Sequence, residues 1–172
     1  MPASAVLAPV STKNPSSMMR LIEFECGGLR FGLPLDCVRR AIPSAEPAPL
    51  PGAGAVVLGV LNVAGEMVAV VDLRRRLGLP AAPLDPAQQI LIAELSGFLA
   101  GIVVDRIHGI EERDAARLFP GEVGAASYVR GMVRLDDGLC LVVEPSRFLF
   151  EGERAALGGA LGAAAGDAYE TA

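Results

Sequence analysis

Apolar and polar residues alternate along two neighbouring stretches near the start of the chain. In residues 22–26 and again in residues 29–33, every second residue is apolar. This two-residue period predicts two strands that are each buried on one face. Gly27-Gly28 separates the two runs and predicts a tight hairpin turn, because such turns need positive φ and glycine adopts it at little cost.

Three further hairpins are predicted in the same way, each from two apolar runs around a short turn. They are residues 57–63 and 66–71 around Ala64-Gly65, 90–95 and 98–104 around Ser96-Gly97, and 132–136 and 139–143 around Asp137-Gly138. Short strands with regularly spaced turns are typical of small closed barrels rather than of a parallel sheet covered by helices.

The predicted helical segments are short and lie at matching places in the two halves of the chain. Asp36 can cap a turn over residues 37–40, and Asp72 can cap a turn that stops before Gly78. Glu144-Pro145 opens a C-terminal helix, which is predicted to end at Gly158-Gly159.

The domain organisation follows from these elements. We expect residues 1–18 to be a flexible tail, with regular structure beginning near Leu21, and residues 19–150 to be the folded domain. Residues 151–172 should contain the end of the helix and a second flexible tail. Residues 43–54, rich in Pro and Ala, are expected to be an extended connection.

The chain also repeats part of its own sequence. Gly32–Val38 is matched by Gly101–Ile107, 69 positions later, and Gly59–Leu61 is matched by Gly131–Val133, 72 positions later. The nearly constant offset predicts one duplicated fold unit, with halves at roughly residues 20–79 and 88–150. The sequence leaves open whether the halves exchange strands. Two similar units side by side form a groove that suits the binding of other proteins.

Composition narrows the class of protein. Of the 172 residues, 52% are hydrophobic, which is enough for a sizeable core and argues against global disorder. No stretch approaches ~18 consecutive apolar residues, so no membrane span is predicted. The N-terminal residues have no basic segment leading into a long apolar one, so we expect no signal peptide and a cytoplasmic location. The net charge of −5 gives no basic field for binding nucleic acid.

The candidate catalytic residues are few. The three cysteines have no CxxC spacing, so buried free thiols are expected rather than a zinc site or a disulfide framework. His108 is the only histidine, and no second one offers a metal site. The carboxylates that follow strands are expected to satisfy free backbone N–H groups; these are Asp36, Asp72, Asp105 and Glu144.

Two alternatives to a protein-binding role stay open. One is a small hydrolase that uses Asp72 or Asp105 with His108. The other is a small-ligand-binding barrel, which would need an empty apolar cavity. Barrel cores filled by large apolar side chains would count against it; the candidates are Phe24, Phe31, Leu33, Ile102 and Val104.

Several motifs, in this order and spacing, resemble the CheW family, the coupling proteins of bacterial chemosensory arrays. The motifs are Leu58–Glu66, Val70–Arg74, Gly101–Asp105 with Ile107 downstream, and Tyr128–Gly131. The resemblance covers roughly residues 20–150. It implies an all-β fold of two intertwined, five-stranded SH3-like barrels with short helices and a C-terminal helix. It also implies a protein with no catalytic site, no metal and no cofactor.

The resemblance further implies partners and a location. The protein would join the tips of methyl-accepting chemotaxis receptors to the regulatory domain of a CheA-type histidine kinase, which has the same fold. It would lie at receptor arrays near the inner membrane without inserting into it. The receptor tip, a helical hairpin, would lie in the groove between the barrels. The residues expected to bind it are Val38, Arg40, Gly59, Asn62, Ala64, Gly65 and Val104.

Two of these residues depart from the family pattern. Arg40 stands where the family has Glu, and Ala64 stands where the family has Arg. In the family this Glu and Arg can form an ion pair at the receptor-facing surface, so both partners have changed together. An exposed pair contributes only ~0.2–1 kcal/mol, whereas charges at the rim of an interface govern specificity. We therefore expect a divergent adaptor in an alternative chemosensory pathway, such as one for surface motility, biofilm formation or second-messenger output.

Overall fold

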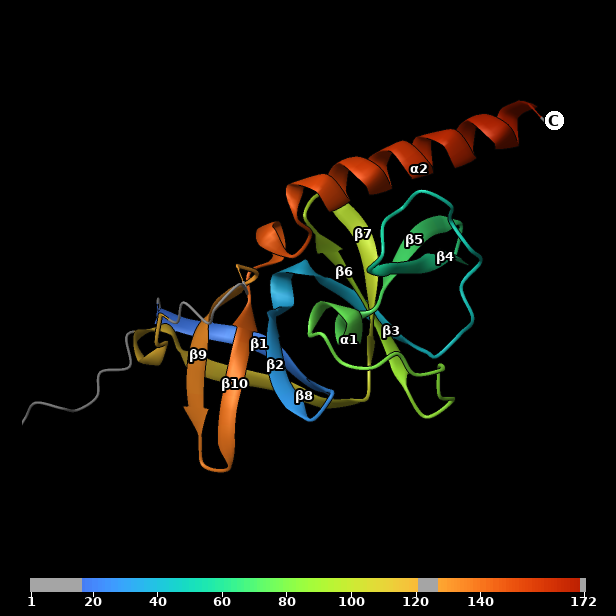
Figure 1. The fold of residues 1–172 in the computed structure, drawn as a ribbon. Helices are drawn as coiled ribbons and strands as arrows, with labels where there is room; N and C mark the ends of the chain where they lie inside the picture. Colours follow the sequence, from blue (N-terminus) through green and yellow to red (C-terminus); the bar gives the residue numbers. More distant parts are fainter. Residues whose placement is uncertain (1–16, 121–126, 171–172) are drawn as a thin grey trace, which may run out of the picture.

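The computed structural model describes the backbone of residues 17–120 and 127–170, with side chains as far as residue 165. Its strands and α-helices appear in Figure 1. The strands are β1 (Met18–Cys26), β2 (Leu29–Pro34), β3 (Val38–Pro43), β4 (Val57–Val63), β5 (Glu66–Val71), β6 (Gln89–Leu95), β7 (Phe98–Val104), β8 (Arg106–Asp114), β9 (Val129–Leu135) and β10 (Gly138–Val143). The helices are α1 (Leu73–Arg76) and α2 (Glu151–Glu170), with 3-10 turns at Leu35–Cys37, Ala115–Arg117 and Pro145–Arg147.

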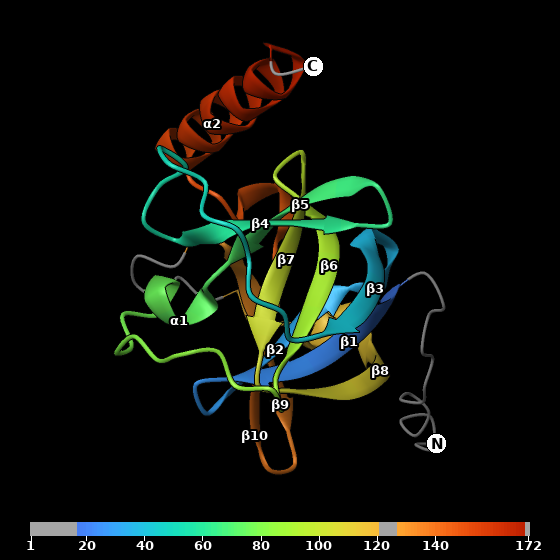
Figure 2. The ribbon, with the colours of Figure 1, turned by 90° about the vertical axis from the view of Figure 1, so that its right-hand side faces the viewer.

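The strands form two five-stranded sheets of identical topology. Barrel A has the order β8-β1-β2-β10-β9 and barrel B the order β3-β6-β7-β5-β4. The hairpins are antiparallel, while β2 with β10 and β5 with β7 pair in parallel. The barrels lie side by side in Figures 1 and 2. The predicted all-β fold of two barrels is confirmed.

The two halves of the chain exchange strands. The β1–β2 hairpin belongs to the first half, but it pairs with β8 and β10 of the second half. The β6–β7 hairpin belongs to the second half, but it pairs with β3 and β5 of the first half. Each barrel is therefore one hairpin from one half and three strands from the other, so neither half can close a barrel without the other.

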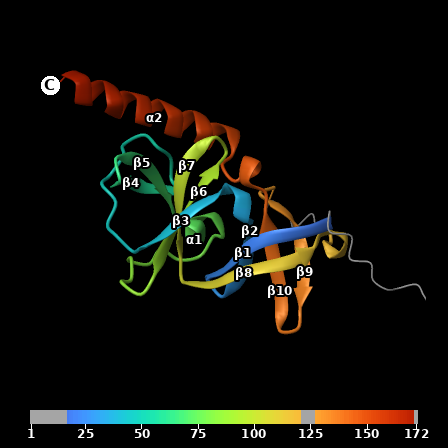
Figure 3. The same ribbon diagram turned by 180° about the vertical axis from the view of Figure 1, so that it is seen from behind.

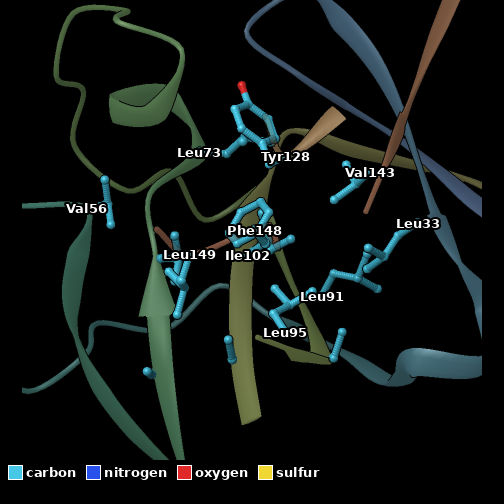
Figure 4. Packing of buried hydrophobic residues seen from close by; sticks show 14 of the residues in the cluster. Leu33, Val56, Leu73, Leu91, Leu95, Ile102, Tyr128, Val143, Phe148 and Leu149 are labelled. Carbon is cyan, nitrogen blue, oxygen red and sulfur yellow. The ribbon is translucent and has the colours of Figure 1, made fainter. Parts of the chain in front are cut away.

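The core has three parts. The largest cluster lies between the barrels. Figure 4 shows that both halves of the chain contribute to it, for example Leu33 and Leu73 from the first half and Ile102 and Phe148 from the second. Successive residues of β6 point alternately into it and into barrel B: Leu91 joins the shared cluster, while Ile90 and Ile92 join the cluster of Val68 and Val70. Barrel A has its own smaller cluster around Leu21, Val133, Cys140 and Val142. Strands buried on both faces explain why a chain of this length is so apolar.

The hairpin turns have the predicted chemistry. Ala64 and Gly65 both have positive φ, as do Ser96 and Gly97, which is the backbone conformation that a two-residue hairpin needs. The four hairpins predicted from the sequence are all present. The last turn lies one residue earlier than predicted, because β10 begins at Gly138.

Several predictions about element types and ends were wrong. Residues 38–40 are not helical: a 3-10 turn ends at Cys37, and Val38 begins strand β3, which pairs with β6. Asp36 lies inside that turn, whose N-cap is Pro34. Strand β8 was missed, because its charged residues lack an apolar alternation. Strand β1 begins at Met18, before the predicted Leu21.

The C-terminal helix is longer than predicted. Helix α2 continues through Gly158-Gly159 to Glu170. Alanine, the strongest helix former, dominates the residues that follow and offsets the cost of ~1 kcal/mol for each glycine. Leu157 and Ala160 are buried against the shared core, which anchors the first half of the helix. Of the expected tails, residues 1–16 and 171–172 lie outside the described part.

Candidate protein-docking site

The two barrels meet at a face where apolar side chains are only partly buried. Ile22 of β1 and Ile107 of β8 come from barrel A, and Val38 of β3 comes from barrel B. All three pack against the shared core while keeping part of their surface exposed. Figure 3 shows β3 beside β1 and β8 at this junction. We call these three residues the junction face.

A groove of roughly 430 Å³ lies beside the junction face on barrel A. Its lining is mainly apolar and comes from the start of β1, the end of β2 and the turn that leads to Val38. Two arginines and one aspartate stand among its lining residues, which are Met18, Met19, Arg20, Leu21, Pro34, Leu35, Asp36 and Arg130. The groove therefore has residues of β1 and β2 on one side and of the turn leading to β3 on the other, with charged side chains among them.

An ion pair stands on barrel B next to this surface. The Arg39 guanidinium donates to the Glu94 carboxylate across the β3–β6 ladder. That hydrogen bond and the Glu94 charge raise the pKa of Arg39 above its usual value, with a smaller contribution from Glu66. Glu66 is the first residue of β5. Both side chains of the pair are more than half exposed, so the pair adds little to stability.

Five of the seven residues expected to bind a receptor reach the surface. Val38 is partly buried, and Arg40, Asn62, Ala64 and Gly65 are exposed. Asn62 Oδ1 accepts a hydrogen bond from the Gly65 N–H at 2.9 Å, which fixes the β4–β5 turn. The structure thus places these residues on β3 and on the β4–β5 turn with the end of β4.

The other two expected residues do not offer a side-chain surface. Val104 is fully buried in the shared core, because β7 lies between the barrels. Gly59 is buried beneath the backbone of Ala48, which bridges to Val60. Both positions serve the fold, and their contact with a partner stays a prediction.

The sequence analysis missed Ile22 and Ile107 as candidates for this site. The alternation of apolar residues showed that both belong to strands, but it could not show which barrel each strand enters. Only the strand exchange brings β1, β3 and β8 to one junction. One feature of the sequence could have indicated Ile107: it follows the motif Gly101–Asp105, which repeats Gly32–Asp36, just as Val38 follows the first copy.

The residues proposed for a hydrolase have other partners. Asp72 Oδ1 accepts from the Arg74 N–H at 3.0 Å and so caps α1. Asp105 accepts from the Gly27 N–H at 2.8 Å and from Gln88 Nε2 at 2.9 Å. His108 Nε2 lies 3.1 Å from Glu25 Oε2. The two aspartates thus hold backbone in place as predicted, and His108 contacts Glu25 and Arg30 instead.

The apolar interior is filled. The five side chains that were expected to fill the barrels are buried, each at 0% exposure, in the shared cluster between them; they are Phe24, Phe31, Leu33, Ile102 and Val104. Phe24 and Phe31 stack with their ring centroids 5.6 Å apart. Within residues 17–120 and 127–165, no group of three or more His, Cys, Asp or Glu side chains could hold a metal ion.

The three cysteines are free thiols. Burial is the main cause that raises the pKa of Cys26, Cys37 and Cys140 to about 12 in each case. Neighbouring carboxylates add to the shift, Asp105 at Cys26 and Glu23 at Cys140. Protonated thiols are poor nucleophiles, so none of these side chains is suited to covalent chemistry at neutral pH.

Comparison with known proteins decides the family. The family model described as the CheW-like domain matches residues 20–152, which is well over half of the chain. The chain belongs to the CheW-like domain family. Among the described residues, no helix is both long enough and apolar enough to cross a membrane.

Individual relatives agree with this assignment. The chain is 30% identical over 141 residues to "Chemotaxis protein CheW" of Rhizobium meliloti (strain 1021), covering 79% of this chain and 91% of that protein. It is 29% identical over 114 residues to "Protein FrzA" of Myxococcus xanthus, covering 64% and 71%. The crystal structure of the scaffolding protein TtCheW from Thermoanaerobacter tengcongensis matches with a TM-score of 0.67 at 22% identity, over 73% of this chain and 88% of that one. The fold is that of a CheW protein, and the chain is a chemotaxis-type adaptor.

Proposed function

We propose that this CheW-like protein couples the tips of methyl-accepting receptors to a CheA-type histidine kinase, and that it acts by binding rather than by catalysis. The main support is the junction face, where apolar residues from both barrels remain partly exposed at the edge of a filled core. A surface of this kind supplies buried area when a helical partner packs on it.

The receptor would dock as a helical hairpin along the junction face. Val38 lies at its centre, between the strands of barrel A and the Arg39–Glu94 ion pair. The adjoining groove, with Leu35 and Arg130 in its lining, extends the apolar surface and carries charge at its rim. Apolar contacts would supply the affinity, and the rim charges would select among receptors.

The coupling mechanism would be geometric. Two barrels joined by exchanged strands and a shared core form one rigid body, so a receptor and a kinase held by it keep a fixed separation. A small displacement of the receptor tip would then favour one of two states of the kinase. The protein would act at receptor arrays near the inner membrane.

Val38→Asp tests the receptor site directly. The purified variant should lose binding to a helical receptor tip, measured by calorimetry, while it still binds the regulatory domain of the kinase from the same cell. Leu139→Asp is the matched control, because Leu139 is 50% exposed on β10 and belongs neither to the junction face nor to the lining of its groove. If Val38→Asp binds the receptor tip as tightly as the unmodified protein, the junction face is not the receptor site.

Leu35→Asp provides a second test, because Val38 also packs against the core and its substitution could disturb folding. Leu35 lines the groove without belonging to the buried core. The same loss of receptor binding is expected, with an unchanged thermal unfolding midpoint. A failure of the unmodified protein to bind the kinase regulatory domain would contradict the proposed coupling as a whole.

Arg40 and Ala64 support a more specialised role in an alternative chemosensory pathway. Both are exposed, and both replace members of the charge pair that the family usually has. The double variant Arg40→Glu/Ala64→Arg should shift binding towards receptors of the flagellar-chemotaxis class, while stability changes by less than ~1 kcal/mol. If the unmodified protein binds that class and a dedicated receptor with equal affinity, the specialised role is excluded.

A further inference from the structure

Leu29 and Leu139 form an exposed apolar pair at the outer end of barrel A. Their exposed fractions are 43% and 50%. Strands β2 and β10 run in parallel with Arg30 opposite Cys140, so the two leucines lie side by side one position earlier. We call this pair the leucine shelf.

The internal repeat gives the leucine shelf a counterpart on barrel B. Leu29 corresponds to Phe98, 69 positions later, and Leu139 corresponds to Met67, 72 positions earlier. Helix α2 covers Phe98: Gly158 has no side chain, and a Cβ placed there would lie 3.7 Å from the Phe98 ring. Met67 remains 53% exposed. On barrel B, the residue equivalent to Leu29 is therefore packed against a glycine-containing helix.

The first half of the chain does not supply such a helix to barrel A. After α1, the side chains of Leu77 and Leu79 lie over Gly27, at the β1–β2 turn. In the second half, the equivalent Leu149 donates its N–H to Ser96 Oγ at 2.9 Å, at the β6–β7 turn. The second half then continues as α2, whereas the first half leaves the barrel at Pro80. Leu29 is consequently left without the cover that its counterpart has.

We propose that the leucine shelf binds helix α2 of a second copy of this chain. Figures 1 and 2 show α2 running well past its own barrel. The helix has 20 residues, about 30 Å at 1.5 Å per residue, and its buried side chains are in the first half. Gly162, Ala163 and Ala165 are exposed, with no atom of the body within 4 Å of a Cβ at Gly162. This segment has the same small-residue composition as the segment that covers Phe98.

Charge is complementary between the two surfaces. Residues 162–170 include Asp167 and Glu170 and no basic residue, and the C-terminal end of a helix carries partial negative charge. On the shelf, the exposed Arg134 stands directly opposite Leu139 in the β9–β10 ladder. Arg30 projects to the other face of β2, because successive side chains of a strand alternate, and it lies 3.9 Å from the exposed Asp137. Arg134 therefore favours the acidic end of α2 over a basic helix.

The proposed contact is between α2 of one copy and the leucine shelf of another. Two copies can therefore form a symmetric dimer in which the α2 of each covers the leucine shelf of the other. One helix on two leucines buries less than the ~1,200 Å² of a standard interface, so association should be weak and concentration-dependent. Sedimentation velocity of the full chain from about 10 to about 300 µM should show a monomer that converts to a dimer.

Two variants and their mixture test the proposal. Leu139→Asp removes the shelf, and truncation after Leu161 removes the projecting half of α2 while keeping the buried Leu157 and Ala160. Each variant alone should sediment as a monomer. Mixed in equal amounts they should associate more than either variant does alone, through the one remaining contact between an intact helix and an intact shelf, although more weakly than the unmodified chain. Ile110→Asp, on β8, should dimerise like the unmodified chain.

Three results would overturn the proposal. They are a full chain that stays monomeric at about 300 µM, a dimer that Leu139→Asp leaves intact, and two monomeric variants that fail to associate when mixed. The last result would indicate a partner other than α2, or a contact between two shelves. Unchanged thermal midpoints for both variants guard against misfolding as the cause. The outcome is independent of the proposed receptor and kinase binding, which is measured with the junction face.

Discussion

Gly59 and Gly131 occupy equivalent positions in the two barrels, and each makes room for a backbone carbonyl. Above Gly59 lies the oxygen of Ala48, and 2.6 Å from the Cβ position of Gly131 lies the oxygen of Phe119. Ala48 exchanges two backbone hydrogen bonds with Val60, at 2.8 and 2.9 Å, and Phe119 exchanges two with Met132, at 2.8 and 3.0 Å. The repeat seen in the sequence therefore extends to single backbone contacts.

Alanine at either glycine should destabilise the protein. A Cβ at Gly59 would collide with the backbone of Ala48, and the φ of +154° is one that alanine rarely adopts. Because the steric overlap and the backbone strain add, we expect a loss of about 2–4 kcal/mol in the free energy of unfolding. Gly131→Ala should lose about 1–3 kcal/mol. Urea denaturation measures both values. Gly159→Ala is the control, because nothing lies within 4 Å of its Cβ position on α2 and alanine should raise stability by up to about 1 kcal/mol.

Arg76 of α1 makes several contacts with the start of α2 and with the segment just before it. Its guanidinium donates to Glu153 at 2.5 and 3.0 Å and to the backbone oxygen of Phe148 at 3.0 Å. It also lies 4.1 Å from the ring centroid of Phe150. Only 5% of the Arg76 side chain is exposed, so removing it leaves Glu153 without its buried partner.

Arg76→Ala should therefore cost about 3 kcal/mol in the free energy of unfolding and loosen α2 selectively. Hydrogen exchange should show faster exchange in α2 than in the barrel strands. The neighbouring Arg75→Ala is the control: its side chain is 43% exposed and its contact with Asp72 is 3.4 Å, so a loss below about 1 kcal/mol is expected. Equal losses in the free energy of unfolding for the two variants would show that the buried contacts of Arg76 do not hold α2 in place.

Barrel A contains a buried ion pair that the sequence did not indicate. Glu23 is 1% exposed and accepts two hydrogen bonds from Arg113 of β8, at 2.9 and 3.0 Å. Glu23→Leu or Arg113→Leu alone should cost about 3–5 kcal/mol, because each leaves one charge without its partner. The double variant should lose less than the sum of the two. Additive losses in urea denaturation would mean that the pair makes no net coupling.

The strands could be predicted from the sequence where one or both faces are apolar. All four hairpins have apolar runs, and in three of them both turn residues have positive φ, so local chemistry largely defines them. Strands β3 and β8 have no such pattern: each is half exposed, carries two arginines, and is a strand because it pairs with β6 or β1. Their structure depends on tertiary pairing, which a local period cannot show.

The candidate docking site, which stays a proposal, could be predicted less completely for a related reason. The sequence indicated Val38 and the β4–β5 turn but not Ile22 and Ile107, and it indicated a strand with one solvent face around Glu23. The sequence predicts a half-buried strand wherever one face is polar, even if residues distant in the chain cover that polar face. In β1 the exchange of strands brings Arg113, 90 residues away, onto the face that carries Glu23.

Alkaline pH should destabilise the protein through its buried thiols. Cys26 and Cys140 are 1% and 0% exposed, and burial raises the pKa of each from 9.0 to about 12. Below pH 9 both thiols keep their protons in the folded and the unfolded chain, so their contribution to stability is fully present. Between pH 9 and 12 only the unfolded chain loses these protons, and the contribution falls by up to about 1.4 kcal/mol per pH unit for each thiol.

Urea denaturation at several pH values between 7.5 and 10.5 measures this slope. The variant Cys26→Ala/Cys140→Ala should lose stability at pH 7.5, because its side chains leave small cavities, but its stability should then fall more slowly with pH than that of the unmodified protein. Val142→Ala makes a cavity in the same barrel cluster as Cys140 without removing a titrating group, so it should keep the full slope. A double cysteine variant with an unchanged slope would show that other groups, such as Tyr128, whose pKa is also raised by burial, cause the alkaline loss.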